Sequence, residues 1–526
     1  MKKYFLKHKG LNLLLIVLLV IQTGIDTITS LLLIPMMNFL SNHKQGDFIK
    51  IVILMGVLFI VMIIVGNLAQ VLQADITQKQ VNDIREDILT NVSNMDYEQF
   101  HSHKSEEYVS WLTNDMAMVE AEGFKNYYSI IENIVAIILT VAALTQLNWT
   151  ITITAIILGI IMAVAPSIFD KKMRKAVENI SEKNESFTSI SNNYLTGFDL
   201  LFHNERTVIL IEKIKNKYEE LKDSKVKQAK VQAAMMVLIL FLNIIAQMTI
   251  IGMTGYYILA GSLTVGAIMT GGNLSSSLYN SIQVMVGAYS RAKANGNILD
   301  KYPVVERDDS GISKDFDNLI SSNNLAYKYN DKSTITYPSF TFSKGKKYAL
   351  IGSSGSGKTT LLKLLIGDLR KYQGNLNFDN DSYSELNVSS LHNNISIVDQ
   401  SNHIFSDTVR NNLTLGLEFT DQEISEATDR AQITDYIESL EDGYDTILKD
   451  TGDLSGGQAQ RLSLARALLF NRDIFLIDEG TSSLDKENAR KVEDTILKMK
   501  DKTVIMITHH LREESKKDFD QIVELR

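Results

Sequence analysis

The fold of the C-terminal part of this chain is decided by one stretch, Tyr348-Ala349-Leu350-Ile351-Gly352-Ser353-Ser354-Gly355-Ser356-Gly357-Lys358-Thr359-Thr360-Leu361-Leu362-Lys363-Leu364-Leu365. Its first four residues form an apolar run typical of a buried strand, and its last five have the composition of a helix. The loop between them is rich in glycine and ends in Lys358 and Thr359. Glycines let backbone N–H groups close around phosphate oxygens, and the helix N-terminus adds its dipole. The stretch therefore predicts a phosphate-binding loop within an α/β domain.

We expect the whole loop to contact a nucleotide. Lys358 is expected to reach the β- and γ-phosphates, and the Thr359 hydroxyl is expected to bind Mg²⁺. The predicted nucleotide-binding residues of the loop are Gly352, Ser353, Ser354, Gly355, Ser356, Gly357, Lys358, Thr359 and Thr360.

A second apolar strand is predicted at Ile474-Phe475-Leu476-Ile477, and it is followed at once by Asp478 and Glu479. Two acids after a strand are, taken alone, more often an ordinary solvated turn. Ligands bind at the carboxyl edge of parallel sheets, however, so these acids suit a site that also contains the phosphate loop. We expect Asp478 to hold Mg²⁺ and Glu479 to orient or deprotonate an attacking water molecule.

The chain up to about residue 300 differs from the rest, because it holds long apolar runs. A membrane-spanning helix needs about 20 mostly apolar residues. Six segments qualify, of which the last is the most polar: Leu11–Leu40, Phe48–Leu72, Tyr127–Leu147, Thr150–Phe169, Ala233–Leu259 and Val265–Tyr289. The basic N-terminus and the basic run Lys171–Lys175 predict that both chain ends and the two long polar segments, 73–126 and 170–232, are cytoplasmic.

Polar residues recur at helical spacing inside these spans. They are Gln22, Asp26, Thr29 and Ser30 in the first, Asn243 and Gln247 in the fifth, and Asn273, Ser276, Ser277, Asn280 and Gln283 in the sixth. They either line a translocation cavity or hydrogen-bond between helices. For the sixth span both interpretations stay open, whereas the cost of burying the charge of Asp26 favours a cavity there.

Composition sets the remaining bounds. The chain has 526 residues, a formal net charge of −9 and no cysteine. The negative charge and the lack of a basic stripe argue against a nucleic-acid-binding protein, and the missing cysteines exclude disulfides and thiolate metal sites. We predict a transmembrane domain at residues 1–297, a linker at 298–318 and a nucleotide-binding domain at 319–526.

The motif Leu454-Ser455-Gly456-Gly457-Gln458, followed by the helical run 459–467, resembles the signature of ABC transporters. Together with six spans and two long cytoplasmic segments, it makes nearly the whole chain similar to an exporter-type half-transporter. The resemblance implies an all-α polytopic membrane domain joined to an α/β ABC ATPase domain. It also implies that Ser455, Gly456, Gly457 and Gln458 contact a nucleotide.

The same resemblance implies roles for single residues. Gln400, after the strand-like Ile395–Val398, resembles the glutamine that binds nucleotide and Mg²⁺, and Asp485 resembles the D-loop aspartate. His509, after the strand-like 504–508, resembles the catalytic switch histidine. Tyr329 resembles the aromatic residue that stacks on adenine, with Tyr327 as a close competitor.

Further features follow from position within the family pattern. Segments near Tyr97–Glu107 and Gly197–Asn204 lie where the family has its coupling helices, although they carry no motif of their own. Gly480 departs from the family, which usually has proline or alanine there. The predicted catalytic set of Glu479, His509, Lys358 and Gln400 is complete.

The resemblance implies that ATP and Mg²⁺ are bound between two ATPase domains, so the chain is expected to pair with an identical or related half-transporter. We expect it to export an amphipathic drug, lipid or peptide across a bacterial plasma membrane, with no nucleic-acid partner. An ATP-gated channel or a regulatory or sensory subunit is the alternative.

Overall fold

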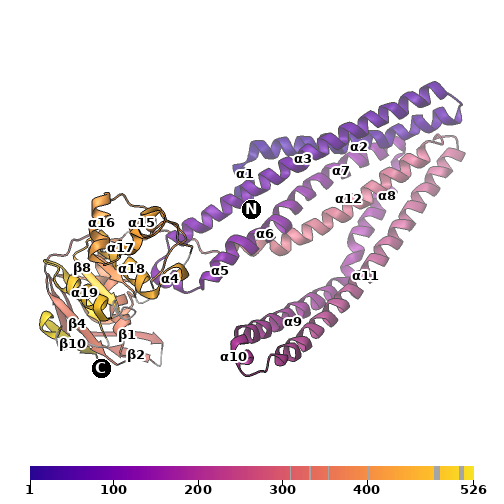
Figure 1. Cartoon of the computed structure of the whole chain (residues 1–526). Helices are drawn as coiled ribbons and strands as arrows, with labels where there is room; N and C mark the ends of the chain where they lie inside the picture. The colour runs from indigo at the N-terminus through magenta and orange to yellow at the C-terminus, as the bar shows by residue number, and fades with distance from the viewer. Residues whose placement is uncertain are drawn as a thin grey trace. The chain divides into compact units, whose positions relative to one another are not determined.

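The computed structural model describes the chain except residues 308–309, 331–332, 354, 400–401, 450, 479–485, 509–514 and 526, together with the side chains of 294–297, 329–330, 333, 451 and 486–488. It divides into two compact units, which are labelled by element in Figure 1. The first unit comprises residues 1–90 and 105–304, and the second comprises residues 91–104 and 305–526.

The described part of the first unit consists of helices. In chain order they are α1 (Lys2–Lys7), α2 (Lys9–Ser41), α3 (Gln45–Ser93), α5 (Ser105–Ser110), η1 (Trp111–Asp115), α6 (Met116–Met118), η2 (Val119–Phe124), α7 (Lys125–Leu147), α8 (Trp149–Val164), η3 (Ala165–Phe169), α9 (Asp170–Thr196), α10 (Phe198–His203), α11 (Val208–Leu259), α12 (Ala267–Asn295) and η4 (Gly296–Lys301). The first five predicted spans each lie within one of these helices or within two consecutive ones, and the sixth, Val265–Tyr289, begins two residues before α12.

Five helical stretches of this unit are long and apolar enough to cross a membrane, among the residues that are described: Lys9–Ser41, Gln45–Ser93, Ser105–Leu147, Trp149–Thr196 and Val208–Leu259. The predicted sixth span corresponds to α12, whose polar residues keep its hydropathy lower. Helix α12 nevertheless packs against α2, α7, α8 and α11. Its Leu274 and Leu278 share an apolar core with Leu144, Ile151 and Ile250.

Apolar side chains also cover the outside of this bundle. Helix α3 exposes a series of large apolar residues, among them Ile53, Ile60 and Ile63, and α11 exposes Leu240 and Ile244. In water such a surface would be unfavourable, because each exposed apolar side chain forgoes the free energy of burial. The arrangement is that of a bundle whose outer surface faces lipid.

The second unit contains two sheets. The strands of the parallel sheet, in spatial order, are β10 (Gln521–Leu525), β4 (Lys347–Gly352), β9 (Thr503–Ile507), β8 (Ile474–Asp478) and β7 (Ile395–Val398). Its helices are α4 (Tyr97–His101), α13 (Lys358–Ile366), α14 (Val388–Asn394), α15 (Val409–Thr414), α16 (Asp421–Arg430), α17 (Thr434–Glu438), α18 (Gly456–Phe470) and α19 (Lys486–Leu497). The strands predicted before the phosphate loop and before Asp478 are therefore confirmed as β4 and β8.

An antiparallel sheet, which was not predicted from the sequence, accompanies the parallel one. It consists of β1 (Leu319–Asn330), β2 (Ser333–Thr336), β3 (Phe340–Ser343), β5 (Tyr372–Phe378) and β6 (Asp381–Ser382). Strand β1 is polar at 321–324 and shifts register against β5 between Asn323 and Ala326. Such a bulge interrupts the alternation by which strands are recognised in sequence. One apolar core, with Phe342 and Leu350, includes residues of both sheets.

The buried carboxylate of Asp379 ties the start of β1 to the end of β5. Its Oδ1 atom accepts hydrogen bonds from the backbone N–H groups of Asn318 (2.6 Å) and Leu319 (2.9 Å), and Oδ2 accepts one from Asp317 (3.0 Å). Asp379 has a backbone φ of 54°, a left-handed conformation that asparagine also tolerates. A carboxylate suits this position because it only accepts hydrogen bonds.

The substitution Asp379→Asn should therefore lower the local stability of β1 by about 2 kcal/mol. The asparagine side chain has an NH₂ group in place of one carboxylate oxygen, and this group cannot accept a hydrogen bond from a backbone N–H. Hydrogen exchange of the β1 amides in the full-length protein measures this change. Asp381→Asn is the control, since Asp381 is partly exposed and pairs with Lys314 (2.6 Å); we expect an effect below about 1 kcal/mol. Equal exchange in the two variants would contradict the role of Asp379.

Candidate functional site

The phosphate loop joins β4 to α13 and is shaped by its glycines. Gly355 and Gly357 have φ values of 83° and 89°, which side chains other than glycine rarely adopt. A Cβ atom at Gly357 would lie 2.7 Å from Cγ2 of Ile335 and 3.0 Å from the hydroxyl of Tyr337. That hydroxyl donates a hydrogen bond to the Gly357 carbonyl (3.0 Å). Tyr337 thus fixes the loop at the point where the helix begins.

Two side chains of the loop are placed for an anion. Lys358 is buried, and its Nζ atom donates to the carbonyls of Gly352 (3.0 Å) and Ser353 (2.9 Å), so the cation folds back over the loop. The buried Ser356 hydroxyl has no hydrogen-bond partner among the described residues. A buried polar atom of this kind is costly unless a ligand or water satisfies it. The loop therefore fits a phosphate group.

The two predicted ligands of Mg²⁺ that the structure describes lie in contact. The Thr359 hydroxyl, at the start of α13, donates to Oδ2 of Asp478 (2.9 Å), at the end of β8. Asp478 is 5% exposed. Oxygen ligands of this kind are those that Mg²⁺ prefers. The residues present therefore fit the ion, and they do so at the carboxyl edge of the parallel sheet.

Several predicted site residues fall outside the described residues, namely Ser354, Gln400, Glu479, Asp485 and His509. Gly480 falls there too. The strands predicted before Gln400 and His509 are present as β7 and β9, and both belong to the sheet that contains β4 and β8. The roles of these five residues stay predictions.

Two residues, Tyr329 and Tyr327, were candidates for the residue that stacks on adenine, and their surroundings can be compared. Tyr329 belongs to β1 by its backbone, and its side chain is not described. Tyr327 is 7% exposed and packs in the apolar core of the unit. A tyrosine in that position has little surface left for a base, which leaves Tyr329 as the candidate.

The signature motif forms the beginning of α18. Ser455 is the N-cap: its hydroxyl accepts from the N–H of Gln458 (3.3 Å), while the Gln458 side chain accepts from the N–H of Ser455 (2.7 Å). Ser455 and Gly456 are exposed, and Gly457 follows in the first turn. The start of a helix offers backbone N–H groups and a positive dipole end to an anion. None of these hydrogen bonds goes to the phosphate loop of the same chain.

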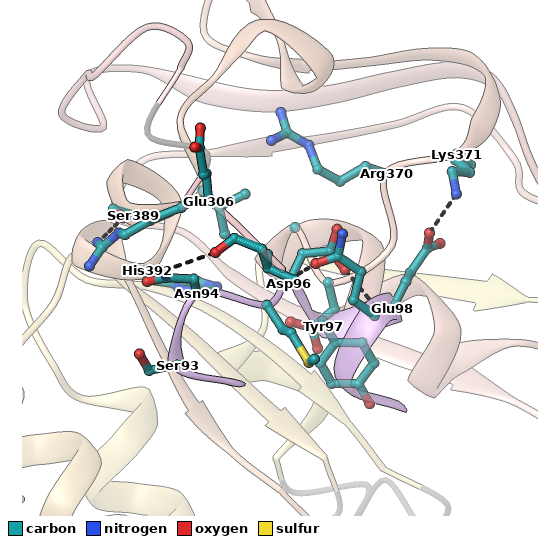
Figure 2. Close-up of a pocket in the computed structure, with 17 residues that line it drawn as sticks. Ser93, Asn94, Asp96, Tyr97, Glu98, Glu306, Arg370, Lys371, Ser389 and His392 are labelled. Carbon is teal, nitrogen blue, oxygen red and sulfur yellow. Dashed lines mark hydrogen bonds and ion pairs between the residues drawn. The ribbon is translucent and has the colours of Figure 1, made fainter. Parts of the chain in front are cut away.

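The segment Asn91–Lys104 belongs to the second unit although it comes from the first half of the sequence. It contains α4, one of the two segments predicted as coupling helices, which begins with a capping box between Asp96 and Gln99. The ring of Tyr97 lies 5.3 Å from Nζ of Lys363 on α13. Glu98 forms an ion pair with Lys371 (3.1 Å), which Figure 2 shows as a dashed line.

A cavity of about 510 Å³ lies between this segment and the residues that follow α13 (Figure 2). Its lining includes Asp368 and His392 but none of the described residues of the phosphate loop, so it is separate from that loop. Burial raises the pKa of the Asp368 carboxyl to about 6. Helix α10, the other predicted coupling segment, exposes Phe198, Leu200 and Phe202.

The polar residues of the membrane bundle form several interhelical hydrogen bonds. Asn273 on α12 donates to the Ser30 hydroxyl on α2 (2.9 Å), and Gln247 on α11 contacts Ser276 on α12 (3.4 Å). Thr270 also donates to the Ser30 carbonyl (3.0 Å). These contacts support the hydrogen-bonding interpretation for that part of the polar face of α12. The Asp26 carboxylate has no hydrogen bond or ion pair within the described part of the chain.

Comparison with known proteins agrees with this architecture. A family model described as the ABC transporter transmembrane region matches residues 13–282, and one described as ABC transporter matches residues 335–482. The chain is 27% identical over 525 residues to an ATP-dependent lipid A-core flippase of Aliivibrio fischeri, covering 97% of this chain and 89% of that protein. It is 26% identical over 526 residues to the flippase of the same name from Haemophilus ducreyi, covering 95% and 89%.

Among solved structures, a bacterial Atm1-family ABC exporter with ATP bound matches with a TM-score of 0.79 and 19% identity, covering 98% of this chain and 93% of that one. This likeness shows the fold. The transmembrane family model by itself covers more than half of the sequence. The chain therefore belongs to the ABC transporters, as a membrane half-transporter of the exporter type whose ATPase domain hydrolyses ATP to drive transport.

Proposed function

We propose that this chain and a second half-transporter, identical or related, export an amphipathic molecule and hydrolyse Mg²⁺-ATP between their ATPase domains. The observation that carries this proposal is the hydrogen bond from the Thr359 hydroxyl to the Asp478 carboxylate (2.9 Å). It joins the end of the phosphate loop to the strand after which Glu479 follows in sequence. A protein that only binds a phosphate group needs no catalytic acid such as Glu479 beside Asp478. The presence of both acids therefore favours hydrolysis.

The chain's own residues divide the work of hydrolysis. Backbone N–H groups of the phosphate loop and the Lys358 ammonium hold the phosphates, and the Ser356 hydroxyl is free to join them. Thr359 and Asp478, with Gln400, would hold Mg²⁺, which neutralises phosphate charge when bound. Glu479 orients or deprotonates the attacking water, and His509 stabilises the charge that develops on the γ-phosphate. Tyr329 stacks on the adenine.

The signature motif supports the pairing of two chains. Ser455 and Gly456 begin α18 with exposed groups, and their side-chain and capping bonds stay within the motif. A phosphate bound by the loop of one chain could accept further hydrogen bonds from the backbone N–H groups at the start of α18 in the other chain. Gln458 and Asp485 complete this interface. ATP then favours the closed pair because it contacts both chains only in that state.

The cargo is proposed from the membrane part. Two relatives, each matched by this chain over 89% of its own length, are named ATP-dependent lipid A-core flippases. The bundle has an apolar exterior and partly polar helix faces inside, which suits a molecule with both polar and apolar parts. We place the bundle in a bacterial plasma membrane with both chain ends in the cytoplasm, in accord with the basic runs at the N-terminus and at Lys171–Lys175.

The substitution Glu479→Gln tests the catalytic assignment in liposomes that contain the full-length protein. We expect ATP hydrolysis to fall by about a hundredfold or more, because the glutamine cannot act as a base, while ATP still binds. ATP-dependent movement of a labelled lipid should stop as well. Hydrolysis at the rate of the original protein would overturn the role of Glu479. Cargo movement that persists without hydrolysis would favour an ATP-gated channel.

The substitution Tyr337→Phe tests how the phosphate loop is held. It removes only the hydroxyl that donates to Gly357, so we expect the dissociation constant for ATP to rise about three- to tenfold, the usual net worth of one hydrogen bond. Tyr383→Phe is a matched control, because the Tyr383 hydroxyl is buried and has no hydrogen-bond partner among the described residues. Titration calorimetry of the purified protein checks both. An unchanged dissociation constant in Tyr337→Phe would contradict the assignment.

A further inference from the structure

Charged side chains are rare in the predicted spans, and those in their interior have one sign. Asp26 on α2 and Glu132 on α7 are the two carboxylates. The one cationic side chain, Lys50, lies near the beginning of α3 and pairs with Asp47 (3.0 Å). Arginine and histidine do not occur in these six segments. The six predicted spans therefore carry two carboxylates in their interior and no cationic side chain there.

Asp26 lies on the inward-facing row of α2. Residues 12, 15, 19, 22, 26 and 30 recur at intervals of three or four, so they share one face of the helix. Leu15, Leu19 and Ser30 in this row are 0%, 5% and 5% exposed. Asp26, between buried neighbours, remains accessible. Its carboxylate has no hydrogen bond or ion pair among the described residues. Asp26, the one charged residue of this row, is therefore also the one whose side chain is exposed.

Glu132 lies on the face of α7 that also carries the buried Tyr128. It lies one turn after Tyr128, which is 1% exposed and donates to Asn12 on α2 (2.6 Å). The exposed apolar side chains of Ile134 and Ile138 lie on the opposite side of the helix. Glu132 is half-buried and also has no hydrogen bond or ion pair within the described part of the chain.

Unsatisfied polar atoms occur next to Tyr128, which lies one turn before this second carboxylate. Gln80 on α3 contacts the Tyr128 hydroxyl (3.2 Å), yet its Nε2 atom is buried without a partner, as is the hydroxyl of Thr77 one turn away. Both residues are at most 1% exposed. Buried polar atoms without partners are costly, and they indicate a place where a ligand or water completes the structure.

The two carboxylates lie at different depths. Asn12 and Tyr128 lie at the same depth along the bundle, because they are hydrogen-bonded to each other. From this depth both α2 and α7 run in the direction that is predicted to lead away from the cytoplasm. At 1.5 Å per residue, Glu132 lies about 6 Å beyond that level and Asp26 about 21 Å beyond it. One cargo could therefore meet Glu132 first and Asp26 later.

We propose that the cargo of this transporter carries a positive charge, as an organic cation or a protonated amine on an amphipathic molecule, and that Glu132 and Asp26 hold this charge in turn. An unpaired carboxylate in a membrane domain is energetically unfavourable unless water or a cation compensates its charge. An anionic cargo would meet repulsion from both groups and attraction from none. This inference rests on the proposed function, because it names the cargo of the same exporter.

Two ions of equal size and opposite charge test the proposal directly, namely tetraphenylphosphonium and tetraphenylborate. The full-length protein in lipid nanodiscs is given each ion, and ATP hydrolysis is expressed relative to the rate of the same variant without cargo. We expect the phosphonium ion to stimulate hydrolysis and the borate ion not to. In Asp26→Asn and in Glu132→Gln, the phosphonium concentration for half-maximal stimulation should rise about tenfold, because one charge attraction is lost.

Three further variants separate charge from shape. Asp26→Glu and Glu132→Asp keep the charge and should retain the preference for the cation, which a merely structural role of the side chain would not predict. Lys50→Gln changes a charge near the end of a span and should leave the phosphonium response as it was. Equal stimulation by both ions, or an unaltered phosphonium response in the Asp26→Asn/Glu132→Gln double variant, would overturn the proposal.

The same preparation in liposomes separates this inference from the proposed function. ATP-driven movement of a labelled neutral lipid, without any preference for the cation, would overturn the inference alone. The absence of ATP-driven movement for the lipid and for both ions would overturn the proposed function together with it. ATP-driven uptake of the phosphonium ion that is lost in Glu479→Gln would support both.

Discussion

The hydrogen bond between Thr359 and Asp478 is the contact on which the rest of the structure depends. It requires that the start of α13 and the end of β8 meet at one edge of the parallel sheet, and β9 lies between β4 and β8 to set that spacing. A triphosphate concentrates negative charge, so its site must combine backbone donors, the Lys358 ammonium and oxygen ligands for a cation. The buried apolar strands hold these groups in place, whereas the membrane bundle converts their chemistry into transport.

The parts of the site that could be predicted are those whose chemistry is encoded locally. Gly355, Gly357, Lys358 and Thr359 occur at fixed spacing between a strand and a helix, so their positions follow from the sequence alone. Tyr337 could not be found in this way, because its contact with Gly357 depends on how the loop after β2 packs against the phosphate loop. The antiparallel sheet was missed for a related reason, since polar residues and a bulge interrupt the pattern of β1.

The membrane domain shows the same division between local and tertiary information. Hydropathy locates the helices, since a span must be apolar over its length. It does not tell which polar residues hold helices together and which face a pathway. The contacts divide them: Ser30, Asn273 and Thr270 are joined across α2 and α12, while the carboxylates of Asp26 and Glu132 have no partner in the described residues. The placement of α4 with the second unit likewise follows from contacts such as that of Glu98 with Lys371.

ATP-driven transport by a pair of chains requires that the phosphate loop of one chain and the signature motif of the other bind the same nucleotide, and this is the central claim to test. The chain has no cysteine, so single cysteines can be introduced at will. One chain would carry Ser356→Cys, and a differently tagged chain would carry Ser455→Cys, both with Glu479→Gln so that ATP persists. With a short thiol-specific cross-linker we expect a covalent pair bearing both tags that forms only with ATP. If both cysteines in one chain instead became linked within that chain, and no cross-linked pair formed, the central claim would be wrong.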